Sequence, residues 1–231
     1  MKILEQVGFF GPIDKKDLLL NIGRILTEFG KKVLIIDGTY LQRLRYVVPK
    51  IGEGQSVTYI SEYCGVDVAV GFMNARGIMQ YLGTNDLPYD YIFIDTDNIQ
   101  TFNSFGVYQM PNIFAVSSYD SYDINKLIEL FRYIQTPIKA TKVIISPDLS
   151  SGKGDLMNQG ASGTNVSFTD NQVEFMDVTE DRKIIIENQL SNQLMFKRFS
   201  SMYKYSLEYI TAIIADKIVN QGDIKAMIKR M

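Results

Sequence analysis

Short apolar runs alternate along most of the chain with segments whose apolar residues recur at helical spacing. The first run covers residues 3–10 and ends at a Gly-Pro turn. In the following segment, 15–29, apolar residues lie three and four positions apart, which predicts an amphipathic helix closed by Gly30. The run KKVLIID comes next and predicts a buried strand that ends on Asp37.

The same alternation continues toward the C-terminus. The pattern predicts, in chain order, a strand at 65–72, a helix at 75–82, the strand YDYIFID ending on Asp95, a strand at 112–118, a helix at 124–134, and strands at 141–147 and 173–178. The stretch 41–67 has no clear period. The Gly- and Ser-rich stretch 148–171 is interpreted as a long surface loop, including the Gly-Lys-Gly string within 150–155. The C-terminal third is predicted to be helical, with one apolar stripe formed by Tyr203, Leu207, Ile210, Ile214 and Ile218.

Buried strands that alternate with amphipathic helices indicate an α/β fold. We expect a mostly parallel sheet of about seven strands with helices on both faces. No linker or internal repeat divides the chain, so residues 1–231 are expected to form one domain. Ligands of such folds bind beyond the carboxyl ends of the strands. The turn after Phe10, together with Asp37 and Asp95, is therefore the place to search for a site.

The composition excludes several kinds of chemistry. The 231 residues include no histidine and one cysteine, Cys64. A Ser-His-Asp triad, a histidine-based zinc site, an intrachain disulfide and a CxxC redox pair are thereby excluded. The net charge of −2 argues against a globally basic nucleic-acid-binding protein. No signal-peptide-like or membrane-spanning apolar run is present, so the sequence predicts a soluble, cytoplasmic protein.

Two segments carry a resemblance to a known family. VGFFGPIDKKDLLLNIGRILTEFGKKVLIIDGT and PYDYIFIDTD resemble the ParA/MinD group of deviant Walker A ATPases, which partition plasmids and position cell-division or surface machinery. The likeness covers most of the chain: the first helix with Asn21, the phrase GKKVLIID, the YDYIFIDTD strand and the closing helix. It implies a P-loop NTPase fold.

The phosphate loop of that family, KGGxGKT/S, falls on residues 10–16 when the chain is aligned on Asn21. Gly11 matches the first glycine and Lys15 matches the loop lysine. Lys15 and Lys16 could attract an anion to the helix N-terminus. The remaining positions depart from the pattern.

Four substitutions alter the chemistry of the loop. Phe10 stands where the family has the signature lysine that reaches the partner's nucleotide, and Lys16 stands where a hydroxyl would hold Mg²⁺. Pro12 removes a backbone N–H that would face phosphate. Asp14 replaces a glycine and adds a negative charge where phosphate oxygens would lie. Four changes in seven residues predict a degenerate Walker A loop that has lost ATP hydrolysis.

The resemblance implies that Asp37 and Asp95 organise the attacking water and the Mg²⁺ shell. The alternative is that each carboxylate simply ends a strand. The candidate residues for a degenerate nucleotide site are therefore Gly11, Lys15, Lys16, Asp37 and Asp95. No catalytic residue, metal ligand or cofactor is predicted; the alternative is a site for ATP and Mg²⁺.

These observations favour a catalytically inactive ParA/MinD-like protein that acts as a dimerising scaffold or spatial-positioning adaptor for an unidentified protein partner. The alternative is a ParA/MinD-type ATPase with an atypical phosphate loop that binds ATP and positions plasmid, division or secretion/pilus machinery. A third hypothesis is a DNA-associated accessory. It rests only on the basic residues Lys197, Arg198 and Lys204 and is not favoured.

Two features bear on assembly. Phe9 and Phe10 end a strand beside the loop, and an exposed aromatic residue there would favour a nucleotide-independent homodimer; the alternative is that they pack into the core. In the tail, 222–231, Gly222 ends one helix and Asp223 caps another, with an apolar stripe beginning at Ile224. The tail resembles the amphipathic tail of MinD-type proteins, which implies weak peripheral membrane contact; the alternative is docking on the protein's own surface or on a partner.

Overall fold

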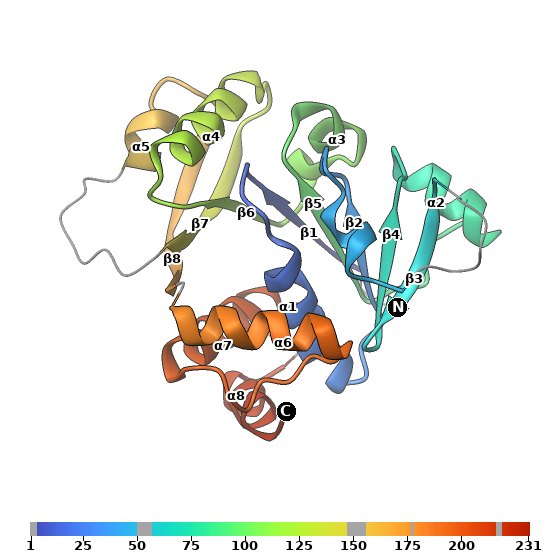
Figure 1. Cartoon of the computed structure of the whole chain (residues 1–231). Coiled ribbons are helices and arrows are strands. Elements are labelled where there is room, and N and C mark those ends of the chain that lie inside the picture. The colour runs from blue at the N-terminus through green and yellow to red at the C-terminus, as the bar shows by residue number, and fades with distance from the viewer. Residues whose placement is uncertain (1–3, 50–56, 147–155, 177, 216–218) are drawn as a thin grey trace.

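An eight-stranded sheet with helices on both faces forms the body of the molecule (Figure 1). The structure is a computed structural model that describes residues 4–49, 57–146, 156–176, 178–215 and 219–231. The strand order is β3-β4-β2-β5-β1-β6-β7-β8, and every neighbouring pair is parallel except β3 and β4. The predicted α/β class and mostly parallel sheet are confirmed, with eight strands in place of about seven.

The bounds of the elements follow the predicted alternation closely. The strands are β1 (Glu5–Phe10), β2 (Val33–Asp37), β3 (Tyr59–Tyr63), β4 (Val66–Val70), β5 (Tyr91–Thr96), β6 (Asn112–Ser117), β7 (Ile138–Ser146) and β8 (Val166–Met176). The helices are α1 (Lys16–Glu28), α2 (Ala75–Leu82), α3 (Ile99–Ser104), α4 (Ser121–Tyr133), α5 (Leu156–Ala161), α6 (Thr179–Ser191), α7 (Ser201–Ala215) and α8 (Gln221–Arg230), with short 3₁₀ helices η1 (Arg43–Tyr46) and η2 (Val107–Gln109).

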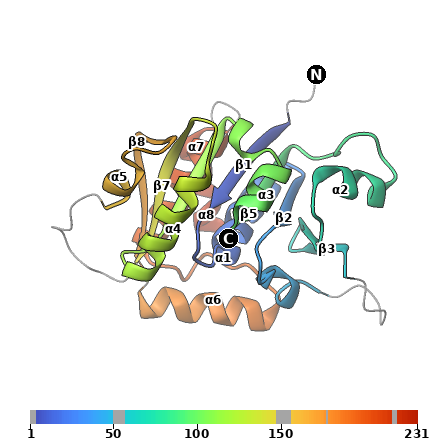
Figure 2. The ribbon, with the colours of Figure 1, turned by 90° about the horizontal axis from the view of Figure 1, so that it is seen from above.

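The helices divide into two layers, one on each face of the sheet. Helices α1, α6, α7 and α8 lie together on one side, and α3, α4 and α5 lie on the other (Figures 1 and 2). Each layer encloses its own cluster of buried apolar side chains. Strands β2 and β5 are buried along their whole length because both of their faces are covered.

The central strand β1 contributes to both clusters. Phe9 stacks on Phe114 in the first cluster, with ring centroids 4.9 Å apart. Phe10 faces the second cluster and packs edge-on against Phe102 and Phe131. Successive strand residues point to opposite faces, so both rings are buried. The alternative that both residues pack into the core is therefore confirmed, and they do not form an exposed dimer contact.

Several elements, among them β3, α3 and α5, lie where the sequence predicted none. Strand β3 falls within 41–67 and pairs antiparallel with β4. The connecting residues Cys64 and Gly65 both have positive φ, 52° and 85°, as a tight type I′ hairpin turn requires. The predicted surface loop 148–171 contains α5 and the beginning of β8. The string at 150–155 lies outside the described residues.

The C-terminal helices pack on the first layer. The predicted stripe of α7 is buried at Tyr203, Leu207, Ile210 and Ile214; Ile218 lies outside the described residues. Helix α8 begins one residue before Gly222, because the side chain of Asn220, and not that of Asp223, caps it by accepting a hydrogen bond from the Gly222 N–H at 2.8 Å.

The apolar stripe of α8 is turned toward the protein. Ile224 and Ile228 are buried in the core cluster that α1 and α7 also supply, and Met231 packs at its margin. While the helix is docked in this way, its apolar face is not available to a lipid surface. No helix in the described ranges is long and apolar enough to cross a bilayer.

Docking of α8 predicts a measurable contribution to stability. We expect Ile224→Val to lower the free energy of unfolding by about 0.5–1.5 kcal/mol, because it removes one buried methyl group. Urea denaturation of the full chain measures this change. Lys225→Ala, on the exposed face of the same helix, is the matched control and is expected to stay within about 0.5 kcal/mol. An unchanged value for Ile224→Val would mean that the helix is undocked in solution.

Candidate functional site

The carboxyl ends of the central strands bring the predicted acidic residues together. Asp37 ends β2 and pairs in register with Asp95 of β5. The neighbouring strand β1 leads through residues 11–15 into α1. The prediction that Asp37 and Asp95 lie at neighbouring strand ends is confirmed, and both carboxylates are buried.

Gly11 fixes the path of the chain as it leaves β1. Its φ of +149° lies in a region that L-residues rarely adopt, and a Cβ atom there would lie 1.9 Å from the carbonyl oxygen of Val116. The Gly11 N–H donates a hydrogen bond to the carbonyl of Thr96, at 3.1 Å. Only glycine fits this close passage between β5 and β6.

The amine of Lys15 contacts two carbonyl oxygens of the loop and the carboxylate of Asp95. Its Nζ donates hydrogen bonds to the carbonyl oxygens of Gly11 and Ile13, at 2.8 and 3.0 Å, and forms an ion pair with Asp95 Oδ1 at 2.9 Å. The side chain is 1% exposed. The loop therefore turns two carbonyl dipoles toward a cation, and β5 adds the carboxylate of Asp95. A phosphate-binding loop turns N–H groups toward an anion.

Asp14 places its carboxylate at the N-terminus of α1. Its Oδ1 accepts a hydrogen bond from the backbone N–H of Lys16 at 3.1 Å. Its Oδ2 lies 2.5 Å from Lys16 Nζ and 3.1 Å from Arg43 Nη1. Burial alone would raise the pKa of Asp14, but its hydrogen bonds and charge interactions with Lys16 and Arg43 outweigh burial and lower that pKa.

Asp37 organises the segment that follows β2. It accepts hydrogen bonds from the N–H and hydroxyl of Thr39, at 3.2 and 2.7 Å, and from the N–H of Leu44 at 3.0 Å. Asp97 fixes the same segment from the end of β5, because it accepts a hydrogen bond from the Tyr40 N–H at 3.0 Å. These contacts hold η1, and with it Arg43, over the loop.

Burial dominates the electrostatics of the two strand-end carboxylates. It raises the pKa of Asp95 to about 7, against the opposing effect of the Lys15 charge and with a further rise from Asp37. Burial also raises the pKa of Asp37, and the hydrogen bonds from Thr39 and Leu44 partly offset that rise. Asp95 therefore changes its charge near neutral pH.

The space left between these groups is small. A cavity of about 30 Å³ lies among loop residues 12–16, the two strand-end carboxylates and the segment from Thr39 to Leu44. This volume matches roughly one water molecule. In the part of the chain that the structure describes, no three acidic or cysteine side chains gather as they would around a metal ion.

The structure brings four of the five candidate residues around this cavity: Lys15, Lys16, Asp37 and Asp95. Gly11 shapes the loop behind it and supplies a carbonyl to Lys15. The amine of Lys16 forms ion pairs with Asp14 and Asp17. Arg43 was not predicted, because it lies in the stretch 41–67, whose sequence has no period that would place it.

Two of the three basic residues considered for DNA contact, Arg198 and Lys204, have partners within the chain. Lys204 Nζ donates a hydrogen bond to the carbonyl of Lys197 at 2.7 Å, and Arg198 forms an ion pair with Glu187. Cys64 lies at the β3-β4 turn, where burial raises the pKa of its thiol. Neither feature adds chemistry to the strand-end site.

Comparison with known proteins bears on the fold. No family model and no curated protein matches the sequence. Among solved structures, the ParA family ATPase from Chlorobium tepidum is 13% identical, with a TM-score of 0.55, over 100% of this chain and 98% of that one. The MinC:MinD complex of Aquifex aeolicus is 12% identical, with a TM-score of 0.56, over 94% and 98%. A point variant of Cyanothece McdA in complex with ATP is 11% identical, with a TM-score of 0.55, over 95% and 100%.

These similarities extend along the whole length of each chain and agree with the strand order and helix layers described above. At 11–13% identity these similarities establish the fold. The chemistry of the site has to be inferred from its own residues. The chain therefore has the same fold as these ParA, MinD and McdA structures.

Proposed function

We propose that this chain is a catalytically inactive ParA/MinD-like protein that serves as a dimerising scaffold or spatial-positioning adaptor. The observation that carries the proposal is the carboxylate of Asp14 on the N–H of Lys16, at the N-terminus of α1. In P-loop proteins the corresponding helix end receives phosphate. Here an anion that belongs to the chain occupies it.

The residues of the site do not fit ATP and Mg²⁺. The amine of Lys15, which would pair with phosphate oxygens, is engaged by Asp95 and by two loop carbonyls. Residue 16 offers an amine where a magnesium ligand would need an oxygen. A triphosphate would need far more space than the cavity of about 30 Å³ and would lie against Asp14. No hydrolytic step is therefore assigned.

The scaffold role rests on the retained fold. One of the similar structures is a complex of MinD with a second protein, MinC. Under this proposal, a chain of the same architecture without nucleotide chemistry holds its partners on its own surface. We infer that the function of this chain lies in binding and positioning proteins.

Nucleotide titration tests the proposal directly. We expect Mg-ATP to bind more weakly than about 100 μM in isothermal calorimetry, because the Asp14 carboxylate repels phosphate and Lys15 is paired. Phosphate release, followed with a colorimetric assay, is expected to equal that of a protein-free blank. Micromolar affinity together with turnover would overturn the proposal and favour the ATPase alternative.

Assembly is proposed to use the segment after β2. Tyr40, Leu41 and Tyr46 are 71%, 63% and 78% exposed and lie on the segment that Asp37 and Asp97 hold beside the phosphate loop. Three large apolar side chains exposed within seven residues favour a dry contact. We expect light scattering at high micromolar concentration to give twice the 26.3 kDa of one chain, with or without nucleotide.

Charged substitutions locate the contact. Leu41→Asp and Tyr46→Asp are expected to weaken the dimer by at least ~10-fold, since each places a carboxylate in an apolar interface. Tyr122→Asp, at a 66% exposed position on α4, is the matched control and is expected to leave the mass unchanged. A monomeric mass for the native chain contradicts this part of the proposal.

A further inference from the structure

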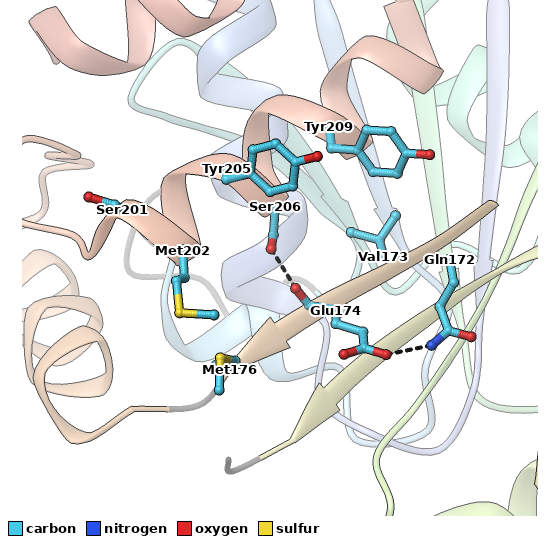
Figure 3. Close-up of a pocket in the computed structure, with 9 residues that line it drawn as sticks. All are labelled: Gln172, Val173, Glu174, Met176, Ser201, Met202, Tyr205, Ser206 and Tyr209. Atoms are coloured by element: carbon cyan, nitrogen blue, oxygen red, sulfur yellow. Dashed lines mark hydrogen bonds between the residues drawn. The ribbon is translucent and has the colours of Figure 1, made fainter. Parts of the chain in front are cut away.

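A groove of about 610 Å³ runs between α7 and the edge strand β8 (Figure 3). Its residues are Gln172, Val173, Glu174 and Met176 on the strand, and Ser201, Met202, Tyr205, Ser206 and Tyr209 on the helix. The groove shares no lining residue with the cavity at the strand ends. It is about twenty times larger than that cavity.

The helix wall is apolar and exposed. Met202, Tyr205 and Tyr209 lie at i, i+3 and i+7 and therefore share one face of α7. The rings of Tyr205 and Tyr209 are stacked, with centroids 6.3 Å apart and planes inclined by 4°. Met202 and Tyr205 are 57% and 62% exposed, an unusual amount for large side chains that lie side by side.

The strand wall is one end of the sheet. Strand β8 pairs with β7 on one side and is the last strand in the order, so its outer edge faces the groove. Gln172, Glu174 and Met176 are alternate residues on this wall. The hydroxyl of Ser206 donates a hydrogen bond to the Glu174 carbonyl (Figure 3). This carbonyl is therefore already engaged by α7, and an added strand would pair with the backbone groups of β8 on either side of it.

The negative charge of the groove favours a basic segment of a partner protein over a second copy of this chain. Glu174 is the one charged side chain among its lining residues, and Asp170 is exposed four positions earlier on the same strand. One oxygen of the Glu174 carboxylate, Oε1, accepts hydrogen bonds from the side chains of Gln172 and Tyr119, which are both neutral and leave its negative charge in place. A second copy paired edge to edge with β8 would bring carboxylates toward each other, which opposes self-association. A segment with a basic residue opposite Glu174 meets complementary charge.

We propose that this groove binds an extended segment of a partner protein, which adds as a strand to the outer edge of β8. The stretch from Gln172 to Met176 corresponds to about five residues of the partner, or roughly 15 Å of strand. Apolar side chains of the segment lie on Met176, Met202 and the stacked tyrosines, and a lysine or arginine lies opposite Glu174. Methionine side chains adapt to such occupants because they are unbranched and flexible.

The test uses a library of random ten-residue peptides displayed on phage and selected against the full chain. We expect the enriched peptides to contain alternate apolar residues and at least one basic residue. Synthesised and labelled, they should bind in fluorescence anisotropy and lose at least ~10-fold in affinity on the Met202→Glu and Tyr205→Ala variants. Both substitutions are at exposed positions and are not expected to impair folding.

Three further measurements separate the possible results. Glu174→Lys should weaken binding of the basic peptides, and replacing their basic residue by glutamate should restore it. Backbone N-methylation at alternate peptide positions should abolish binding, as strand pairing requires, and Tyr122→Ala on α4 should leave it unchanged. Enriched peptides that are insensitive to the groove variants, or that bind as helices, overturn the proposal. A homodimer that dissociates on Met202→Glu also overturns it, because the occupant would then be a second copy.

Discussion

Mg-ATP is expected to bind at least ~10 times more tightly to a chain carrying Pro12→Gly, Asp14→Gly and Lys16→Thr than to the native chain. Removing Asp14 frees the backbone N–H at the N-terminus of α1 and releases Arg43 from its ion pair. Glycine at position 12 restores an N–H that proline lacks. Threonine at position 16 supplies a hydroxyl for Mg²⁺. Calorimetry on the native and triple-variant chains measures the difference.

Two further variants identify the cause of any gain in Mg-ATP affinity: Asp14→Gly alone, and the triple variant with Lys15→Ala added. Asp14→Gly alone is expected to recover part of the affinity, since it removes the competing anion. Adding Lys15→Ala to the triple variant should abolish the recovered binding, because the phosphate charge then has no lysine to meet. If the triple variant remains without measurable affinity while it is folded by circular dichroism, the carboxylate and the lost hydroxyl do not explain the absence of nucleotide binding.

The unfolding free energy is expected to fall by about 2 kcal/mol between pH 5.5 and pH 8 through Asp95 alone. The pKa of this carboxyl is about 7 in the folded chain and near its ordinary value of 3.8 in the unfolded chain. Between these two values the folded state binds more protons than the unfolded state. The stabilisation is therefore fully present below the unfolded value and is lost as the pH rises through the folded one. Urea denaturation at both pH values measures the fall.

The contribution of Asp95 is isolated by the slope of the unfolding free energy against pH, and not by its absolute value. Asp95→Asn leaves Lys15 without its ion pair and changes stability at every pH, but it should remove most of the pH dependence. Burial also raises the pKa of Asp37, so any pH dependence that this group contributes has the same sign. Asp86→Asn, at an exposed loop position, is the control and should keep the native slope. Equal slopes for the native and Asp95→Asn chains would mean that this carboxylate is charged throughout the range.

The central sheet could be predicted from the sequence because its strands are buried on both faces. Strands β2 and β5 contain uninterrupted apolar runs that lead into an aspartate, and their pairing follows from the parallel topology. Strand β3 was missed because YISEY is short and lies at the other edge of the sheet, where its pairing with β4 depends on a turn at Cys64 and Gly65. Neither the cysteine nor the glycine identifies that turn by itself.

Helix α5 was missed for a different reason. Its sequence, LMNQGA, is short and contains a glycine, so local propensity does not favour a helix. The helix is held by packing on α4, where Gly160 lies so near Ile128 that an added Cβ would fall 2.2 Å from its Cγ1. A contact between residues so far apart in the chain has no signature in the local pattern.

At the candidate site, the residue types could be predicted and their orientation could not. The repulsive charge of Asp14 follows from the sequence. Its hydrogen bond from the Lys16 N–H and its ion pair with Arg43 depend on how η1 is folded over the loop. In the same way, the sequence places Lys15 at the loop but does not determine whether its amine points to a ligand or inward to Asp95.

The hydrogen bond between Asp14 and the first N–H of α1 has a consequence for regulation. The Asp14 carboxylate accepts a hydrogen bond from the N–H of Lys16, only two residues away. An external phosphate would have to compete for that N–H with a carboxylate that is tethered beside it and has a very high effective concentration. Ordinary changes in a free nucleotide pool shift such a competition very little. Under the proposed function, assembly of this protein would follow how much of it the cell makes, and not the ratio of ATP to ADP.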